Sequence, residues 1–241
     1  MIPCPWSPAV STLLLWSYVA VMAAGAALFV AWSRDPRGLP RLEYAVAAAI
    51  PLWSGLWYAV MALGGGQTEV AGQTTYWARY ADWLVSTPLL LVALSLTAMH
   101  ALPRKRWDLV AALVIVDVFM ITCGLLADLQ EDTTARYAFY GAGVVALLVI
   151  FYLVAVPLRR VALQQPPEMA AVHKDVSVLL AVLWTGYPVI WLLGPSGLGV
   201  FGDGTDTALF VLLPILSKVG WSIVDLGRLR ALSRDDRLEV A

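Results

Sequence analysis

Residues 210–221 read Phe-Val-Leu-Leu-Pro-Ile-Leu-Ser-Lys-Val-Gly-Trp, an apolar segment that contains one lysine, Lys218. If this segment belongs to a helix that begins near Asp206, Lys218 lies roughly 18 Å along the helix and therefore near the middle of a membrane. An ionisable residue at that depth is costly and is a functional candidate by default. Burial disfavours a free ammonium, which suits Schiff-base formation with an aldehyde. The alternative is a buried lysine that pairs with an acid.

The composition of the whole chain is that of a membrane protein. Of its 241 residues, 60% are hydrophobic and 14% are charged, whereas soluble domains carry about a quarter charged residues. Seven stretches are long enough to cross a hydrocarbon core, which takes roughly 20 apolar residues. We predict a single all-α domain over residues 1–241, a seven-helix bundle that crosses the cell membrane repeatedly. The expected helices lie near 8–32, 42–63, 76–99, 107–127, 135–157, 172–193 and 206–228.

Charge is distributed unequally between the two sets of loops. The acidic set holds Glu69, Asp128, Glu131, Asp132 and Asp203. The basic set, with the C-terminal segment, holds Arg34, Arg37, Arg41, Arg104, Lys105, Arg106, Arg159, Arg160, Lys174, Arg228, Arg230, Arg234 and Arg237. Basic loops stay in the cytoplasm, so we predict an external N-terminus and a cytoplasmic C-terminus. This rule explains the arginines more simply than nucleic-acid binding does.

The third expected helix supplies a partner acid for Lys218 in Trp77-Ala-Arg-Tyr-Ala-Asp-Trp-Leu-Val-Ser-Thr-Pro88. Arg79 and Asp82 are three residues apart and share one helix face, which Ser86 continues. A buried cation needs an anion beside it. We therefore expect Asp82 to balance Lys218 and Arg79 to hold Asp82 ionised. The alternative is a structural Arg–Asp pair within one helix.

Aromatic residues on the sixth expected helix indicate a pocket. Trp184, Tyr187, Pro188 and Trp191 recur at helical spacing, and we expect Trp83 and Tyr58 to join them from other helices. Flat walls of this kind suit a long apolar ligand, although aromatic stripes also serve ordinary helix packing. The two cysteines, Cys4 and Cys123, share no spacing motif, so neither a disulfide nor a metal site is expected.

Three motifs in this order resemble those of microbial (type 1) rhodopsins, over essentially the whole chain. They are Arg79-Tyr-Ala-Asp-Trp83 with Ser86-Thr-Pro88, Trp184-x-x-Tyr187-Pro188-x-x-Trp191, and Ser217-Lys-Val-Gly220. The resemblance implies retinal bound covalently to Lys218 as a protonated Schiff base, with Asp82 as its counterion. It also implies a chromophore lining made of Trp83, Thr87, Leu90, Met120, Tyr140, Gly143, Trp184, Tyr187, Pro188, Trp191 and Pro214.

Within this family the chain looks most similar to the branch of xenorhodopsins and Anabaena sensory rhodopsin. Supporting stretches are residues 33–38, 50–55, 194–197 and 213–214. Pro214 stands where outward proton pumps such as bacteriorhodopsin carry a second counterion aspartate. Three positions sort the pumps of this family by type, and in this chain they are Asp82, Ser86 and Ala93. In outward pumps the third position is a carboxylate that returns a proton from the cytoplasm. Ala93 cannot bind a proton.

Two further acids follow from the resemblance to this branch. Asp225, seven residues after Lys218, matches the residue that accepts the Schiff-base proton on the inner side, although it could instead be a helix-end acid in contact with Arg228. Glu43 matches a cytoplasmic acid of the Anabaena protein, and its place near the end of a helix makes a solvated role equally compatible with the sequence. Ala47 stands where some xenorhodopsins have an assisting histidine.

The resemblance also implies roles for two other acids, one structural and one on the external side. Asp117 matches a buried carboxyl that bonds to the third helix at Thr87, and a structural role is expected. Asp206 matches an acid near the outer mouth, but its usual partner acid in a neighbouring loop is replaced by Ser196, which leaves an outward-type release pair incomplete.

We therefore expect a retinal protein of the membrane that acts as a light-driven inward proton pump and is not an enzyme. The alternative is a photosensor that signals through a cytoplasmic transducer, with the arginine-rich segment from Arg228 to Arg237 as a docking surface rather than a topology anchor. Expected partners are retinal, protons, the lipid bilayer and further copies of the chain in a homo-oligomer, and no nucleic acid.

Overall fold

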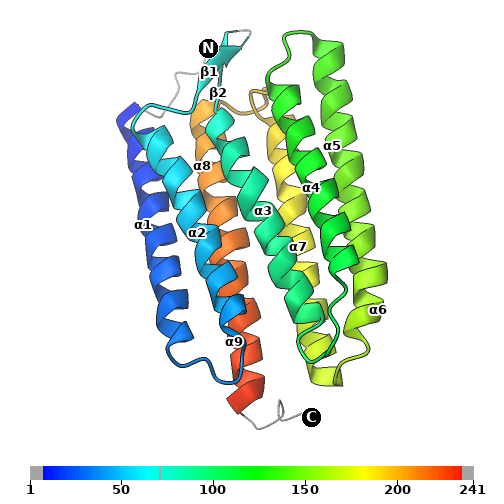
Figure 1. The fold of residues 1–241 in the computed structure, drawn as a ribbon. Coiled ribbons are helices and arrows are strands. Elements are labelled where there is room, and N and C mark those ends of the chain that lie inside the picture. The colour runs from blue at the N-terminus through cyan, green and yellow to red at the C-terminus, as the bar shows by residue number, and fades with distance from the viewer. Residues whose placement is uncertain (1–7, 71, 235–241) are drawn as a thin grey trace.

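Seven helical segments stand side by side in one bundle (Figure 1). The structure, a computed structural model, describes residues 8–70 and 72–234, without the side chains of residues 8–10, 233 and 234. The first four segments in chain order are single helices: α1 (Pro8–Ser33), α2 (Arg41–Ala62), α3 (Trp77–Ala98) and α4 (Trp107–Asp128). The rest are α5 (Thr133–Leu153) continued by η1 (Val154–Leu158) and α6 (Arg159–Ala162), then α7 (Pro167–Leu193), and α8 (Asp203–Pro214) continued by η2 (Ile215–Gly220) and α9 (Trp221–Arg234). A short antiparallel hairpin, β1 (Thr68–Val70) with β2 (Gln73–Thr75), joins α2 to α3.

Each of the seven segments among the described residues is long and apolar enough to cross a membrane, as the sequence predicted. The largest differences from the predicted bounds are at the polar ends. The fifth segment ends at Ala162 rather than at residue 157, and the sixth begins at Pro167 rather than at residue 172. The seventh covers 203–234 rather than 206–228. Proline is favoured in the first helical turn, and polar helix ends extend beyond the apolar part that a hydrophobicity pattern detects.

Two segments contain a wide π-helical turn, and each turn lies at or directly after a proline. Pro157 lies inside η1, and Pro214 immediately precedes η2. Proline has no backbone N–H and its ring crowds the carbonyl four residues earlier, so the regular α-helical hydrogen bonding is interrupted there. Lys218 lies in η2, and the irregular backbone therefore determines where the one fully buried lysine of the described residues points.

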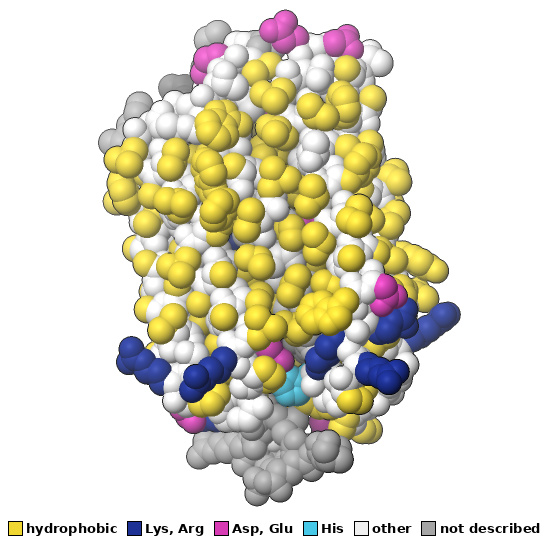
Figure 2. Space-filling view, in the orientation of Figure 1, with side chains coloured by type: hydrophobic (Ala, Val, Ile, Leu, Met, Phe, Trp, Pro, Cys, Tyr) yellow, Lys and Arg dark blue, Asp and Glu magenta, His cyan; other side chains and the backbone are white. Residues whose placement is uncertain are grey.

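The outer surface has an apolar belt between two polar ends. Figure 2 shows hydrophobic side chains over the middle of one face, with most of the Lys and Arg side chains near one end and carboxylates at the other. We call the end with the loops 34–40, 99–106 and 163–166 the basic end, and the end with the loops 63–76, 129–132 and 194–202 the acidic end. By the positive-inside rule we expect the basic end to face the cytoplasm.

Candidate functional site

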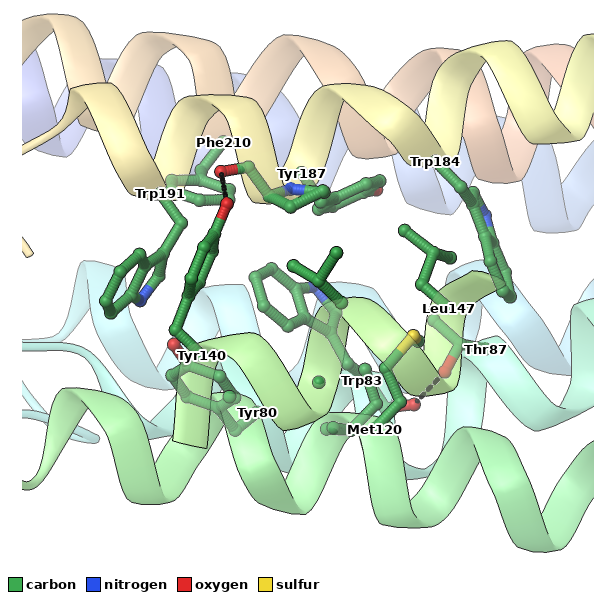
Figure 3. Close-up of a pocket in the computed structure, with 15 residues that line it drawn as sticks. Tyr80, Trp83, Thr87, Met120, Tyr140, Leu147, Trp184, Tyr187, Trp191 and Phe210 are labelled. Carbon is green, nitrogen blue, oxygen red and sulfur yellow. Dashed lines mark hydrogen bonds between the residues drawn. The ribbon is translucent and has the colours of Figure 1, made fainter. Parts of the chain in front are cut away.

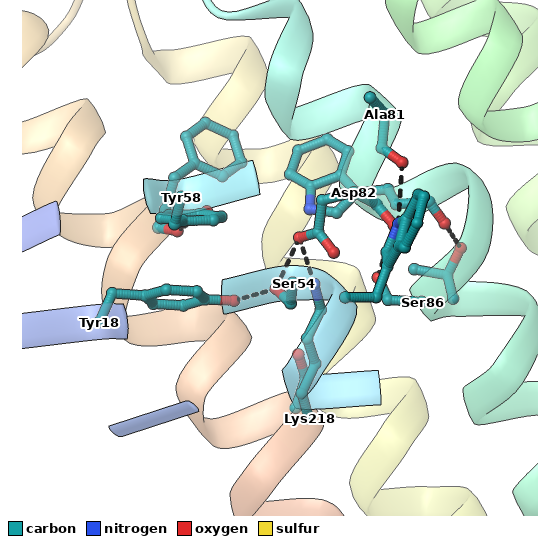
Figure 4. A network of polar contacts seen from close by, with 12 residues as sticks. Tyr18, Ser54, Tyr58, Ala81, Asp82, Ser86 and Lys218 are labelled. Carbon is teal, nitrogen blue, oxygen red and sulfur yellow. Dashed lines mark hydrogen bonds and ion pairs between the residues drawn. The ribbon is translucent and has the colours of Figure 1, made fainter. Parts of the chain in front are cut away.

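Lys218 and Asp82 form an ion pair at the centre of the bundle. The Lys218 ammonium donates to Asp82 Oδ2, and both side chains are completely buried. Lys218 Nζ also donates to Ser54 Oγ at 2.8 Å, and Ser54 Oγ donates to Asp82 Oδ2 at 2.8 Å (Figure 4). Charge-assisted hydrogen bonds of this kind are among the strong ones. The structure thus brings together the predicted lysine and its predicted acid.

Ser54 and Tyr18 belong to this network and were missed in the sequence. The Tyr18 hydroxyl lies 2.5 Å from Ser54 Oγ, and it donates because the single Ser54 proton is directed at Asp82. Ser54 lies in one of the stretches that support the family branch, but nothing in its spacing predicted a contact with another helix. Tyr58 was expected in the aromatic pocket, and this was wrong: its ring stacks on Tyr18 and its hydroxyl donates to the Phe210 carbonyl.

The expected contact between Arg79 and Asp82 does not form in the structure. Arg79 instead donates to Asp206 Oδ2 at 2.8 Å, and its guanidinium lies over the rings of Tyr76 and Phe210. A long side chain three residues from an acid can equally reach an acid of another helix. The Arg79–Asp206 pair borders a polar cavity at the acidic end, which Ser196 also lines.

The other predicted residues of α3 point into the interior. Ser86 is fully buried, and its hydroxyl donates to the Asp82 carbonyl at 2.9 Å. Thr87 donates to Asp117 Oδ2 at 2.7 Å, which is the predicted contact between α3 and α4. Asp117 is fully buried.

An aromatic pocket lies between α3, α4, α5 and α7 (Figure 3). Its lining includes nine of the eleven residues that the resemblance implied: Trp83, Thr87, Met120, Tyr140, Gly143, Trp184, Tyr187, Pro188 and Trp191. The remaining two, Leu90 and Pro214, are buried but do not line it. Tyr140 stacks on Trp191 with ring centroids 4.6 Å apart.

Asp128 connects the aromatic pocket to the acidic end, although the sequence indicated only a loop acid. It accepts hydrogen bonds from the Tyr80 hydroxyl and from Trp191 Nε1, each at 2.7 Å. Both donors line the aromatic pocket. The available signal was its position at the last turn of an apolar helix.

Asp225 lies on the basic-end side of Lys218 and is buried. Seven residues along a helix place it roughly 10 Å from the lysine. Thr97 donates to Asp225 Oδ1 at 2.8 Å. The alternative of a helix-end acid bound to Arg228 was wrong, because Arg228 instead pairs with Asp175. Asp225 borders a small cavity, the basic-end cavity, which is lined by Glu43, Ala47, Ala93, Thr97, Trp221, Ser222, Asp225 and Leu226.

Glu43 is a second buried acid at the basic-end cavity. The solvated role was wrong: Glu43 is 7% exposed, and its Oε1 lies 2.6 Å from His100 Nδ1. The sequence did not predict this pair, since His100 follows α3 at a bend of the chain. Lys105 lies nearby and donates to the Met99 and His100 carbonyls. Burial lowers the pKa of Lys105, and the negative charge of Glu43 opposes that effect.

The arginine-rich end of the chain is partly built into the fold. Arg230 is 6% exposed and donates to the Trp32 and Asp35 carbonyls and to the Tyr44 hydroxyl. Arg230 is therefore not available to a partner as part of the expected docking surface. Arg237 and Cys4 lie outside the described residues, and Cys123 is a buried free thiol.

Comparison with known proteins gives one consistent result. The family described as "Bacteriorhodopsin-like protein" matches residues 9–232. Archaerhodopsin-3 of Halorubrum sodomense is 38% identical over 199 residues, which cover 81% of this chain and 75% of that protein. Bacteriorhodopsin of Haloterrigena sp. (strain arg-4) is 35% identical over 229 residues, covering 92% and 90%.

Solved structures agree with these relatives. The thermophilic rhodopsin from Rubrobacter xylanophilus superposes with a TM-score of 0.86 at 33% identity and covers 92% of this chain and 97% of that one. The light-driven proton pump Coccomyxa subellipsoidea rhodopsin gives a TM-score of 0.81 at 25% identity, with 90% and 95% covered.

Proteins of this family bind retinal through a Schiff base to a lysine, and the interior of this chain fits that group. The aromatic pocket has flat apolar walls, and Lys218 is the completely buried lysine beside its counterion. Among the described residues, Asp82 Oδ1 and Trp83 Nε1 are buried polar atoms without a hydrogen-bond partner, as expected where a ligand and water complete the site. The chain is a multi-pass membrane protein that carries retinal, and it belongs to the bacteriorhodopsin-like family of microbial rhodopsins.

Proposed function

We propose that this protein is a light-driven inward proton pump of the xenorhodopsin type, with Lys218 as the retinal-bearing residue. The observation that carries the proposal is the place of Asp225. It is a buried carboxyl between Lys218 and the basic end, bonded to Thr97 and bordering a cavity that also reaches Glu43. By the positive-inside rule this is the cytoplasmic side.

When bound, retinal supplies the absorption of light and the isomerisation that follows it. The proton itself is handled by side chains of the chain. At rest the proton on Lys218 Nζ is held by Asp82, which also accepts from Ser54. Two donors on one carboxylate oxygen stabilise the carboxylate. Asp82 therefore serves as counterion.

The proton leaves Lys218 Nζ toward Asp225. The carboxyl of Asp225 is oriented by Thr97, and beyond it the basic-end cavity leads to Glu43 and His100. Acids and histidine are the usual side chains for relaying protons. Ala93, which lines the same cavity, offers no group that could return a proton from this side.

Reprotonation of Lys218 comes from the acidic end. Arg79 and Asp206 form an ion pair there and border the polar cavity. By the positive-inside rule we take this end to be external. Asp82 follows Arg79 by about one turn on α3 and pairs with Lys218, so it lies between the Arg79–Asp206 pair and the lysine. Pro214 is buried in the seventh segment and has no side chain that could serve as a second counterion. Asp82 is therefore the one carboxylate that pairs with Lys218 among the described residues.

The second candidate function is photosensing through a cytoplasmic transducer. It requires an accessible surface at the basic end. The exposed pair Arg228–Asp175 could contribute to such a surface, but the burial of Arg230 reduces it. We therefore favour transport.

The direct test is the pH of the medium around illuminated cells that express the protein with retinal. Inward pumping makes the medium alkaline, and a protonophore abolishes the change. Cells that express the Lys218→Ala variant, which cannot bind the chromophore covalently, serve as the control. Acidification of the medium would reverse the proposed direction, and an unchanged pH in the presence of a coloured protein would favour the sensor.

A further inference from the structure

A cavity of about 450 Å³ lies between the fifth and sixth segments in the basic half of the bundle, and the proposed function does not use it. We call it the lateral cavity. Its inner wall is formed by Leu91 and Leu94 of α3 and by Trp184 of α7. Ala155 of η1 and Val178 of α7 also line it, and both are exposed on the outer surface of the bundle. The lateral cavity therefore opens toward the lipid.

The sequence explains why the two segments separate here. Pro157 interrupts the hydrogen bonding of the fifth segment, and the resulting π turn displaces the backbone. Small side chains, Ala155 and Ala181, face the gap where larger ones would close it. The opening is thus a feature of the local sequence.

The walls of the lateral cavity suit hydrocarbon better than water. Most of its lining is aliphatic or aromatic. An apolar protein cavity of about 150 Å³ stays dry and takes up small hydrophobic molecules. The lateral cavity is larger and opens to the bilayer, where acyl chains are the most abundant hydrophobic group. An acyl chain can therefore enter it from the side.

The rim toward the basic end carries cations that have no acid partner. Arg159 and Lys174 both line the lateral cavity, and neither pairs with a carboxylate in the described part of the chain. His173 lines it as well; its side chain is completely buried and its Nδ1 has no hydrogen-bond partner among the described residues. A buried nitrogen without a partner points to a polar group that completes the site.

We propose that the lateral cavity binds one anionic phospholipid of the surrounding bilayer. One acyl chain lies between η1 and α7 and reaches Trp184, while the phosphate contacts Arg159 and Lys174. An ester oxygen of the same lipid is the partner of His173. Basic pockets between transmembrane helices on the cytoplasmic side bind anionic headgroups in this way.

The test uses the retinal-loaded protein in vesicles of phosphatidylcholine with a minor share of phosphatidylglycerol. After detergent extraction and washing, the lipids that remain on the protein are quantified by mass spectrometry. Wild-type protein should retain phosphatidylglycerol well above its share in the vesicles. The double variant Arg159→Gln, Lys174→Gln should lower that retention about tenfold or more, since each cation that contacts the bound headgroup strengthens anionic lipid binding severalfold.

Two further variants separate the headgroup from the chain. Arg160→Gln removes the neighbouring exposed arginine of α6, which does not line the lateral cavity, and should leave retention within about twofold of wild type. Ala181→Leu fills the cavity with both cations intact and should lower retention as strongly as the double variant. An unchanged visible absorption band shows that each variant is folded.

Four results would overturn the proposal. They are retention in proportion to the vesicle composition, no loss in the double variant, an equal loss in Arg160→Gln, and full retention in Ala181→Leu. Full retention in Ala181→Leu would mean that the cations attract headgroups at the surface and that no acyl chain enters the lateral cavity.

Discussion

Two buried aspartates make the same contact with α3 but lie in different surroundings. Asp117 of α4 accepts from Thr87 at 2.7 Å, and Asp225 of α9 accepts from Thr97 at 2.8 Å. Thr87 faces the aromatic pocket, whereas Asp225 itself borders the basic-end cavity that continues to Glu43. The Asp117 pair therefore joins two helices beside the chromophore, and the Asp225 pair lies on a route out of the membrane. A buried acid becomes a proton carrier only where its surroundings connect it to a source and an exit.

The largest expected effect comes from removing each acid in turn. Asp225→Asn should slow light-driven transport about 100-fold, because the lost group is a general base in the proton path, and it should leave the colour nearly intact. Asp117→Asn should keep the transport rate within about threefold and shift the absorption band through Thr87. Proton flux and absorption spectra of both variants, measured in the same vesicles, check this.

A transport rate unchanged in Asp225→Asn would remove that residue from the proton path. Equal losses in the two variants would mean that any buried carboxyl bonded to a threonine of α3 matters in the same way, and the contrast between the two surroundings would fail.

The pair of Glu43 and His100 extends the comparison, because no acid–histidine pair lies beside Asp117 in the described part of the chain. Glu43→Gln and His100→Gln should each slow proton release at the basic end about tenfold, a change of about 1.4 kcal/mol in the barrier. Since the two side chains lie 2.6 Å apart, the double variant should be little slower than either single one. A pH-sensitive dye on the basic-end side reports the release after a light flash.

Arg104→Gln is the control for this measurement, since Arg104 lies exposed in the same loop as His100. If Arg104→Gln slows release as much as His100→Gln, the effect reflects the charge of the loop. Additive losses in the double variant would mean that Glu43 and His100 act separately.

Much of the fold and part of the site could be predicted from the sequence, but only where the information lies within one helix. The apolar runs marked all seven segments, and helical spacing placed Trp184, Tyr187 and Trp191 on one pocket wall. Contacts between helices were harder to predict. Arg79 could reach Asp82 or Asp206, and the choice depends on how α3 and α8 pack.

His100 and Ser54 illustrate the same limit. Each is a polar residue whose spacing within its own helix or loop indicates no partner. Their roles follow from neighbours that lie 57 residues away in the case of Glu43 and 28 residues away in the case of Asp82. The family resemblance supplied Asp225, but its contact with Thr97 required the packing of α9 against α3.

The smallest expected effect comes from the two threonines. Thr97→Val removes the hydrogen bond to Asp225, and Thr87→Val removes the bond to Asp117 and one to the Trp83 carbonyl. Such a bond contributes about 0.6 kcal/mol on average in membrane proteins, so both variants should lower thermal stability slightly, Thr87→Val somewhat more. Their functional effects should differ. Thr97→Val leaves Asp225 without its orienting donor and should slow proton transfer to the basic end about threefold, whereas Thr87→Val should alter the absorption band and leave that step unchanged. Flash-induced absorbance changes separate the two, and a slower transfer in Thr87→Val alone would assign the proton path to the wrong aspartate.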